Sequence, residues 1–472
     1  MSTTCHLFFG LWTMYLESIV QRCGHGVPSI YPMDEELIKL CMVDRLERLG
    51  LAEHFFEGIE DVLAHVYRNF INEEPQAMAE YVVPLQIYKD SLAFRLLRLH
   101  GYHVSPRRFC WFLSRKDILL HMDENYEYFF SAMFNVYRAA DFIFSGENDL
   151  EDARLFAKKI LKKQTSRQNT KDGVVMQSNL QSEVKHEISL AWLARLDHLE
   201  HRMCIEGSKS SDLWMGKASF YRLSCLNIML LQLATENYTT RQSIYRNELD
   251  ELRRWSKDSG LCDMGFAREK TTYCYFAMAA TISLSYLSDV RMVAAKSGII
   301  VIIVTVADDF FDIGGSLDEL KILMEAVRRW EGKGLLDTDG AEVEYAPTID
   351  EYLQDAMTSV AVQNIALPTS CLVSPPLPKH IMGCPQNEMV TNLLMVSTRL
   401  LNDVQSYQRE QEEGKLNIVL LYMKENPDLD IEDSITRTRR TLDEKKKELL
   451  KHILVDGISD MPKACKQVHL AL

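Results

Sequence analysis

Apolar residues recur along this chain at intervals of three and four positions, the spacing that places them on one face of an α-helix. The segments 33–51 and 91–102 show this pattern clearly and contain Gly50 and Gly101 near their ends, where glycine stops helices. The same spacing predicts further helices at 128–144, 151–163, 186–203, 219–236, 242–258, 266–287, 291–310, 317–330, 349–366, 388–411 and 433–454. Strand alternation and hairpin dipeptides are nearly missing, so the sequence predicts an all-α protein.

Polar and proline-rich stretches interrupt the helical pattern and suggest how the chain is divided. Residues 163–183 are polar and predict an exposed loop, and the prolines of 368–378 (PTSCLVSPPLP) predict another. The segment 204–212 (CIEGSKSSD) lies between long helical patterns and is the better domain boundary. We therefore predict two domains, 1–210 and 211–472, with a single large helical domain as the alternative.

Composition and charge narrow the classes of partner. The 472 residues are 47% apolar and carry a net charge of −14, which argues against nucleic acid as a partner because phosphate backbones need basic faces. The longest apolar run, 298–307, is too short to span a membrane. The 11 cysteines contain no C-x-x-C pair, so free thiols in a reducing compartment are expected. The first residues show neither a secretory signal nor a convincing transit peptide.

An acidic cluster follows that apolar run in VADDFFDIGG, 306–315. On a helix, Asp308 and Asp312 are four residues apart and share a face, with Asp309 on its flank. Like charges at this spacing destabilise a helix by a few tenths of a kcal/mol, and a cation removes the repulsion. Oxygen ligands suit Mg²⁺ or Mn²⁺. From this cluster alone, a metal site and a solvated acidic helix end are equally good interpretations.

A second cluster lies in RLLNDVQSYQREQEEGKLN, 399–417. Asn402, Ser406 and Glu410 recur every four residues and would form a ladder of three oxygen ligands on one helix face. Arg399 precedes Asn402 by three residues and adds a positive charge to that face. Alone, this pattern is typical of a polar stripe on a surface helix. Together, the two clusters predict several Mg²⁺ ions held around one diphosphate.

DDFFD followed by N-D-x-x-S-x-x-x-E resembles the paired metal motifs of class I plant terpene synthases, and most closely those of ent-kaurene synthases and kaurene-synthase-like diterpene synthases. The segments 29–55 and 93–105 resemble the helical, α-barrel-like β domain of that family. The segments 266–281, 287–316 and 347–368 resemble its catalytic helical bundle, the α domain. The resemblance therefore implies a β domain at 1–210 and a metal-binding catalytic α domain at 211–472.

The resemblance also implies roles for individual residues. Three Mg²⁺ ions are expected, with Mn²⁺ as a substitute; Asp308, Asp309 and Asp312 would hold two of them and Asn402, Ser406 and Glu410 the third. The diphosphate would be bound by Arg268, Lys270 and Arg399. Candidates for shaping the pocket are Tyr273, Tyr275, Phe276, Phe310 and Phe311, and Ile365 matches a position that influences the product. Plain core packing is the alternative for each of these apolar residues.

The expected substrate follows from a missing motif. A class II cyclase of this family would carry D-x-D-D, which occurs nowhere in the chain. The resemblance therefore implies a copalyl-type diphosphate, such as ent-copalyl diphosphate supplied by a class II copalyl diphosphate synthase. The expected reaction is cyclisation to ent-kaurene or a related diterpene hydrocarbon with release of diphosphate, a lyase step of gibberellin biosynthesis. Plastid localisation is implied, although the lack of an evident transit peptide leaves the cytosol open.

Two further features bear on activity. Asp308 and Asn402 are 402 − 308 = 94 residues apart, which is shorter than the family spacing, and the chain ends at KACKQVHLAL. We therefore expect an internal stretch and the C-terminal end of the catalytic bundle to be missing. A non-catalytic or weakly active member that keeps metal and diphosphate binding is the alternative function. A chain-elongating prenyltransferase is disfavoured because it would carry a second D-D-x-x-D.

Overall fold

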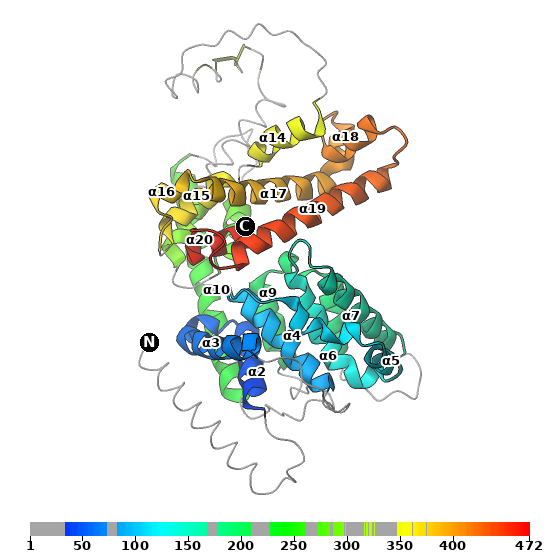
Figure 1. Ribbon diagram of the computed structural model, residues 1–472. Coiled ribbons are helices and arrows are strands. Elements are labelled where there is room, and N and C mark those ends of the chain that lie inside the picture. Colours follow the sequence, from blue (N-terminus) through cyan, green and yellow to red (C-terminus); the bar gives the residue numbers. More distant parts are fainter. Residues whose placement is uncertain are drawn as a thin grey trace, which may run out of the picture. The chain divides into compact units, whose positions relative to one another are not determined.

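The computed structural model is helical throughout the part of the chain that it describes (Figure 1). It describes residues 34–72, 83–167, 178–208, 227–260, 271–283, 287–296, 298, 316, 318–319, 321–322, 325, 347–360, 362–373 and 375–472. Every regular element in these ranges is an α-helix or a 3₁₀-helix. The predicted all-α class is therefore confirmed.

Seventeen of the described elements are α-helices. They are α2 (Glu35–Arg48), α3 (Phe56–Asn72), α4 (Val83–Leu99), α5 (Lys116–Glu124), α6 (Tyr126–Ala139), α7 (Asn148–Arg167), α8 (Ser178–Ser189), α9 (Asp197–Ser208), α10 (Asn227–Asp258), α11 (Thr271–Thr281), α14 (Ile349–Ser359), α15 (Gln363–Leu372), α16 (Lys379–Met382), α17 (Pro385–Glu412), α18 (Ile418–Glu425), α19 (Ile431–Leu454) and α20 (Lys463–Ala471). Short 3₁₀-helices connect them at Ala52–His54, Pro106–Arg108, Cys110–Ser114, Ala140–Phe142 and Trp192–Ala194.

The chain divides into two compact units. Unit 1 comprises residues 1–242 and 450–458, and unit 2 comprises residues 243–449 and 459–472. The predicted boundary at 210/211 falls in 209–226, which lies outside the described residues, so the predicted domain limits stay a prediction. The long helix α10 contributes its first half to unit 1 and its second half to unit 2.

Unit 1 is built around α4, which packs against α2, α3 and α6. Its segment SLAFRLLR carries Leu92, Phe94, Leu96 and Leu97, all almost fully buried, on several faces of the helix. A helix that is apolar all round belongs in the interior of a domain. The hydrophobic core of unit 1 is continuous from α2 to the first half of α10.

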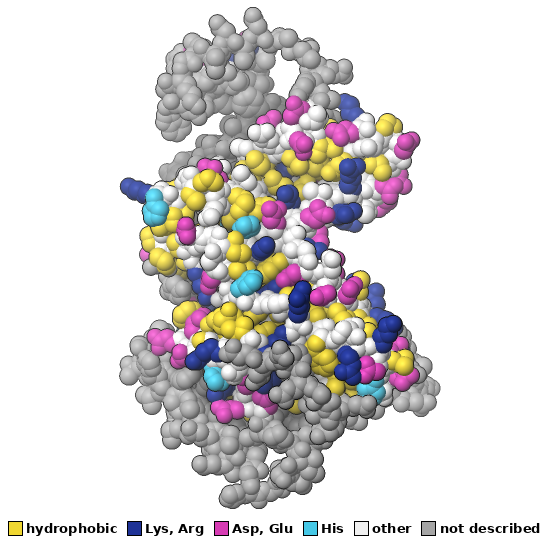
Figure 2. Space-filling view, viewed as in Figure 1, with side chains coloured by type: hydrophobic (Ala, Val, Ile, Leu, Met, Phe, Trp, Pro, Cys, Tyr) yellow, Lys and Arg dark blue, Asp and Glu magenta, His cyan; other side chains and the backbone are white. Residues whose placement is uncertain are grey.

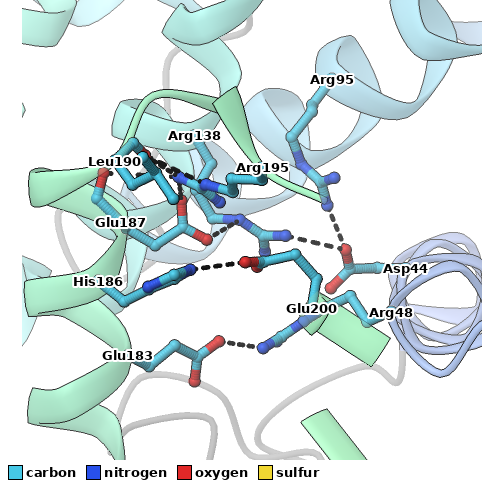
Figure 3. Close-up of polar contacts among 10 residues, drawn as sticks. All are labelled: Asp44, Arg48, Arg95, Arg138, Glu183, His186, Glu187, Leu190, Arg195 and Glu200. Atoms are coloured by element: carbon cyan, nitrogen blue, oxygen red, sulfur yellow. Dashed lines mark hydrogen bonds and ion pairs between the residues drawn. The ribbon is translucent and has the colours of Figure 1, made fainter. Parts of the chain in front are cut away.

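Buried charges connect the helices of unit 1 (Figure 3). Asp44 of α2 pairs with Arg95 of α4, and Arg138 of α6 lies 3.2 Å from Glu187 of α8. Burial alone would raise the pKa of the Asp44 carboxyl, but the guanidinium groups around it outweigh burial and hold that pKa well below its usual range. Further pairs drawn in the same view are Arg48–Glu183, Arg195–Glu187 and His186–Glu200. These contacts connect α2, α4, α6, α8 and α9 inside unit 1.

Unit 2 is organised around α17, a helix of 28 residues that packs against α14, α15, α16, α18 and α20 (Figure 1). Pro385 occupies its first turn, where the missing amide proton costs no hydrogen bond. Leu400 and Val404 of α17 contribute to a core shared with α14, α18 and α19. A second cluster joins Leu394 and Met395 of α17 to α15. α17 thus contributes to both of these hydrophobic clusters of unit 2.

Several predicted element limits are wrong. The segments predicted as separate helices at 219–236 and 242–258 form one helix, α10, from Asn227 onwards. In the polar stretch between them, the hydroxyl groups of Thr235, Thr239 and Thr240 donate to carbonyl oxygens four residues earlier, so these side chains are satisfied within the helix. The segment predicted as one helix at 186–203 is divided between α8 and α9, and the Arg195 side chain donates to the carbonyl oxygen of Leu190 (2.8 Å) just past the end of α8.

The two predicted loops are also corrected in part. In 163–183, α7 continues to Arg167 and α8 begins at Ser178, while 168–177 lies outside the described residues. In 368–378, the first five residues belong to α15, which continues through Pro368. The hydroxyl of Thr369, the next residue, donates to the carbonyl oxygen of Ile365 (2.7 Å). The predicted helix 349–366 is correspondingly two helices, α14 and α15.

Candidate metal and diphosphate site

The second predicted cluster lies on α17, as expected for residues that recur every four positions. Asn402 is exposed, whereas Ser406 and Glu410 are 8% and 7% exposed. The Ser406 hydroxyl donates to the carbonyl oxygen of Asn402 (2.9 Å). Because the hydroxyl proton is used in this bond, the lone pairs of Ser406 Oγ are left to act as acceptors or metal ligands.

The carboxylate of Glu410 is held by a residue outside the predicted set. Asn417 Nδ2 donates to Glu410 Oε2 at 2.7 Å. Glu410 Oε1 lies 4.0 Å from a guanidinium nitrogen of Arg409, whose side chain is 68% exposed. The two oxygens of Glu410 therefore have different surroundings, one tied to a buried amide and the other near a solvated cation.

Arg399 lies at the centre of a buried polar network with α14. Its guanidinium is 2.7 Å from Asp403 Oδ1 and donates to the Tyr352 hydroxyl oxygen (2.6 Å). The Tyr352 hydroxyl in turn donates to Asp403 Oδ2 (2.8 Å). Burial raises the pKa of the Asp403 carboxyl, because the neighbouring Arg399 guanidinium and Tyr352 hydroxyl offset only part of the desolvation. The predicted diphosphate ligand Arg399 is thus oriented by two side chains that the sequence did not single out.

Asp403 is fully buried and is a functional candidate that sequence reasoning missed. Its Oδ2 also accepts from the backbone amide of Ile418, the first residue of α18 (3.1 Å). The signals in the sequence were its place beside Asn402 in the N-D-x-x-S motif, off the ladder, and its four-residue spacing from Arg399, which favours an ion pair on one helix. Its other partners come from α14 and α18, and no local pattern predicts them.

The first predicted cluster cannot be compared with this geometry. The residues concerned are Asp308, Asp309, Phe310, Phe311 and Asp312, together with Arg268 and Lys270, and all lie outside the described residues. Their roles as ligands, diphosphate contacts or pocket residues stay predictions. Within the described ranges, no group of three His, Cys, Asp or Glu side chains could hold a metal ion.

The other predicted pocket residues have diverse surroundings. Tyr275 on α11 is almost fully buried, and its hydroxyl donates to Glu248 of α10 (2.6 Å), which also binds the buried Arg291. This arrangement is typical of core packing, the alternative considered for this residue. Tyr273 and Phe276 of the same helix are 68% and 58% exposed, and Ile365 is half-buried on α15. Their part in shaping a pocket stays a prediction.

Acidic and basic side chains are interspersed over the described residues on the face drawn in Figure 2. Among the described helices, none combines the length and the apolar character needed to cross a membrane.

The donor set of α17 fits a hard divalent cation. Asn402, Ser406 and Glu410 offer an amide, a hydroxyl and a carboxylate oxygen, the ligand types that Mg²⁺ and Mn²⁺ prefer. Arg399 lies on the same helix and supplies the planar donor that suits phosphate oxygens. These residues therefore offer oxygen donors and a guanidinium on one helix, and their binding of a cation and a diphosphate stays a prediction.

Three family models match the chain and identify its class. The model for the terpene synthase N-terminal domain matches residues 11–188. The terpene synthase family metal binding domain matches residues 257–338, and the terpene synthase family 2 C-terminal metal binding model matches residues 335–448. The chain belongs to the terpene synthase family.

Curated relatives extend this similarity over nearly the whole chain. S-linalool synthase from Clarkia breweri is 41% identical over 97% of this chain and 58% of its own length. (E,E)-geranyllinalool synthase from Arabidopsis thaliana is 41% identical over 97% of this chain and 56% of its own length. Ent-kaurene synthase-like 1 from Ricinus communis is 31% identical over 96% of this chain and 67% of its own length. The chain thus spans little more than half the length of the first two relatives.

Solved structures agree with the fold. Abietadiene synthase from Abies grandis superposes with a TM-score of 0.75 at 26% identity, covering 97% of this chain and 66% of that protein. Isoprene synthase from grey poplar, in complex with three Mg²⁺ ions and dimethylallyl-S-thiolodiphosphate, superposes with a TM-score of 0.73 at 24% identity over 93% of this chain and 87% of that one. The helical fold is that of the terpene synthases.

Proposed function

We propose that this protein is a class I terpene synthase that ionises a prenyl diphosphate in the presence of Mg²⁺. The observation that supports the proposal best is the face of α17, where an oxygen-ligand ladder and an oriented Arg399 occur together. A solvated polar stripe would not need a buried network behind its arginine. The metal-binding family models matched to this half of the chain add support.

The roles of the residues follow from the chemistry of a leaving diphosphate. Asn402, Ser406 and Glu410 would hold one Mg²⁺, and Asp308, Asp309 and Asp312 would hold two more. When bound, the ions stabilise negative charge that develops on the diphosphate as the C–O bond breaks. Arg399, Arg268 and Lys270 would bind the released diphosphate. Apolar and aromatic walls would then keep the remaining carbocation from uncontrolled contact with water.

For the substrate, we propose an acyclic prenyl diphosphate and a tertiary allylic alcohol as the product. The relatives named for linalool and geranyllinalool are 41% identical, whereas the ent-kaurene synthase-like relative is 31% identical. In such a reaction the C–O bond to diphosphate breaks, water adds to the tertiary carbon of the allylic cation, and one proton is released. Cyclisation of copalyl diphosphate to ent-kaurene, predicted from the sequence, is the second candidate.

The shortened spacing of the motifs bears on activity. The alignment with S-linalool synthase extends over 508 positions, whereas 97% of this chain is about 458 residues, so about 50 positions of the relative have no counterpart here. The two metal-binding family models also meet at 335–338, within the stretch where the sequence predicted a missing segment. A weakly active or non-catalytic protein that still binds Mg²⁺ and diphosphate therefore stays the alternative function. Plastid localisation stays a prediction.

Product analysis separates these functions. Purified protein would be incubated with Mg²⁺ and, separately, geranyl, geranylgeranyl and copalyl diphosphate isomers, and products would be identified by gas chromatography and mass spectrometry. We expect an acyclic tertiary alcohol from geranyl or geranylgeranyl diphosphate. A hydrocarbon formed from ent-copalyl diphosphate alone would favour the second candidate, and no product from any substrate would favour the non-catalytic alternative.

The variant Asp308→Ala tests whether the product comes from this site. Loss of one predicted metal ligand should lower product formation by about 100-fold or more, because charge on the leaving group is no longer stabilised. The exposed Asp428, in the loop before α19, provides a matched control, and Asp428→Ala should leave the rate unchanged. Equal activity of wild type and Asp308→Ala would contradict the assignment of the acidic cluster.

A further inference from the structure

Asn417 lies at the junction between α17 and α18 and connects both helices. Gly414, with φ of 68°, makes the turn that ends α17, a conformation that favours glycine. The backbone amide of Lys415 then donates to the carbonyl oxygen of Glu410 (2.8 Å). Asn417 follows as the N-cap residue of α18 and is fully buried. A buried asparagine must satisfy both its amide protons and its carbonyl oxygen.

The side chain of Asn417 satisfies all of these requirements within the site. Its Oδ1 accepts from the backbone amide of Val419 (2.9 Å), which is the usual capping bond. Its Nδ2 donates to Glu410 Oε2 (2.7 Å) and to the carbonyl oxygen of Asp403 (3.0 Å). Capping needs only the oxygen, and serine or aspartate would cap α18 equally well. The side-chain nitrogen of Asn417 is therefore not needed for capping, and its hydrogen bond orients the Glu410 carboxylate.

Asp403 connects the N-terminus of α18 to Arg399, the predicted diphosphate ligand. Its carboxylate accepts from the amide of Ile418 and pairs with the guanidinium of Arg399. The N-terminus of α18 thus fixes a predicted metal ligand through Asn417 and a predicted diphosphate ligand through Asp403. One helix start positions both groups.

We propose that Asn417 is a positioning residue for the metal site, which orients the Glu410 carboxylate by a direct hydrogen bond. The proposal rests on the proposed function of the α17 ladder. Residues that hydrogen-bond a ligating carboxylate orient it, and their loss commonly weakens metal affinity by about 10–100-fold. The same magnitude is expected here because Glu410 Oε2 would lose its amide donor.

Titration calorimetry with Mg²⁺ and inorganic diphosphate tests the proposal. The variant Asn417→Ser keeps an N-cap oxygen and loses the donor to Glu410. We expect its apparent Kd for Mg²⁺ in the presence of diphosphate to rise by about 10–100-fold. If the serine variant does not fold, Asn417→Thr, which also keeps a capping oxygen and fills more of the space, is used in its place with the same expectation.

Two comparisons separate positioning from a general loss of stability. Asp430 caps the neighbouring helix α19 by accepting from the amide of Asp433 (2.8 Å). Asp430→Ala removes a cap without touching the ladder and should leave Mg²⁺ affinity unchanged. In a Glu410→Gln background, Asn417→Ser should cause little further loss of affinity, because its effect acts through Glu410.

The outcomes also distinguish this proposal from the proposed function. If wild-type protein shows no Mg²⁺-dependent diphosphate binding, the proposed function fails. If wild-type protein binds and Asn417→Ser binds equally tightly, the positioning role is overturned and the proposed function stands. Additive losses in the double variant would likewise overturn a role that acts through Glu410.

Discussion

At the scale of single residues, His100 provides the clearest pH-dependent contribution to stability. Its Nε2 lies 2.9 Å from Glu47 Oε1 and its Nδ1 lies 3.3 Å from Glu60 Oε1, inside unit 1. Burial alone would lower the pKa of this histidine, but the two carboxylates outweigh burial and raise the pKa to about 9. The ordinary pKa of histidine is about 6.5. The native state therefore holds a proton that the unfolded chain releases near neutral pH.

This difference in pKa predicts how stability changes with pH. Because the pKa is higher in the folded state, the stabilisation is fully present below about pH 6.5 and is lost as pH rises through about 9. His100→Gln should lower the free energy of unfolding most at pH 6, and the difference from wild type should shrink by pH 10. The free energy of unfolding of each variant is measured at each pH by urea denaturation followed by circular dichroism, with the exposed His103→Gln as control. A difference that does not change with pH would contradict the ion-pair explanation.

At the scale of elements, α14 begins with a capping box formed by Thr348 and Glu351. The Thr348 hydroxyl oxygen accepts from the amide of Glu351, while the Glu351 carboxylate accepts from the amide of Thr348 (2.9 Å). This signal is local, since it depends on two residues three positions apart. It matters for the site because α14 carries Tyr352, which contacts Arg399 and Asp403.

Removal of this cap should destabilise unit 2 measurably. Thr348→Ala leaves an amide of the first turn without its partner and should lower the free energy of unfolding by about 1 kcal/mol. Thr348→Asp, which restores a capping oxygen, should recover most of the loss. Both are measured by chemical denaturation. Equal stability of Thr348→Ala and wild type would show that solvent replaces the cap at this exposed position.

At the scale of the whole molecule, ligand binding should stabilise the fold. A ligand that binds only the folded state at 100 times its Kd adds about 2.7 kcal/mol, which corresponds to a rise in Tm of roughly 5–10 °C for a unit of this size. We expect saturating Mg²⁺ with inorganic diphosphate to produce such a rise, and EDTA to reverse it. Differential scanning fluorimetry measures this change in Tm. Glu410→Gln should reduce the shift, and no shift in wild type would favour a protein without a metal site.

The sequence alone was sufficient for the features that depend on local spacing or on family motifs. Apolar periodicity predicted an all-α fold, the four-residue recurrence of Asn402, Ser406 and Glu410 predicted a shared helix face, and DDFFD with N-D-x-x-S indicated the terpene synthase family. Local signals misplaced helix limits in α10 and α15, because polar residues and Pro368 predict helix breaks, whereas both helices continue through them. The resemblance also favoured ent-kaurene synthases, whereas relatives at 41% identity are named for linalool and geranyllinalool.

Only the tertiary structure decided which side chains support the predicted ligands. Asp403 meets Tyr352 across 51 positions of sequence, and His100 meets Glu47 across 53. Such partners are brought together by the packing of separate helices, and their burial sets their pKa values, so no spacing along the chain encodes them. Asn417 combines one feature that the sequence indicates with one that only the tertiary structure decides. Its place before α18 is typical of an N-cap, but its bond to Glu410 depends on the turn that brings α18 back against α17.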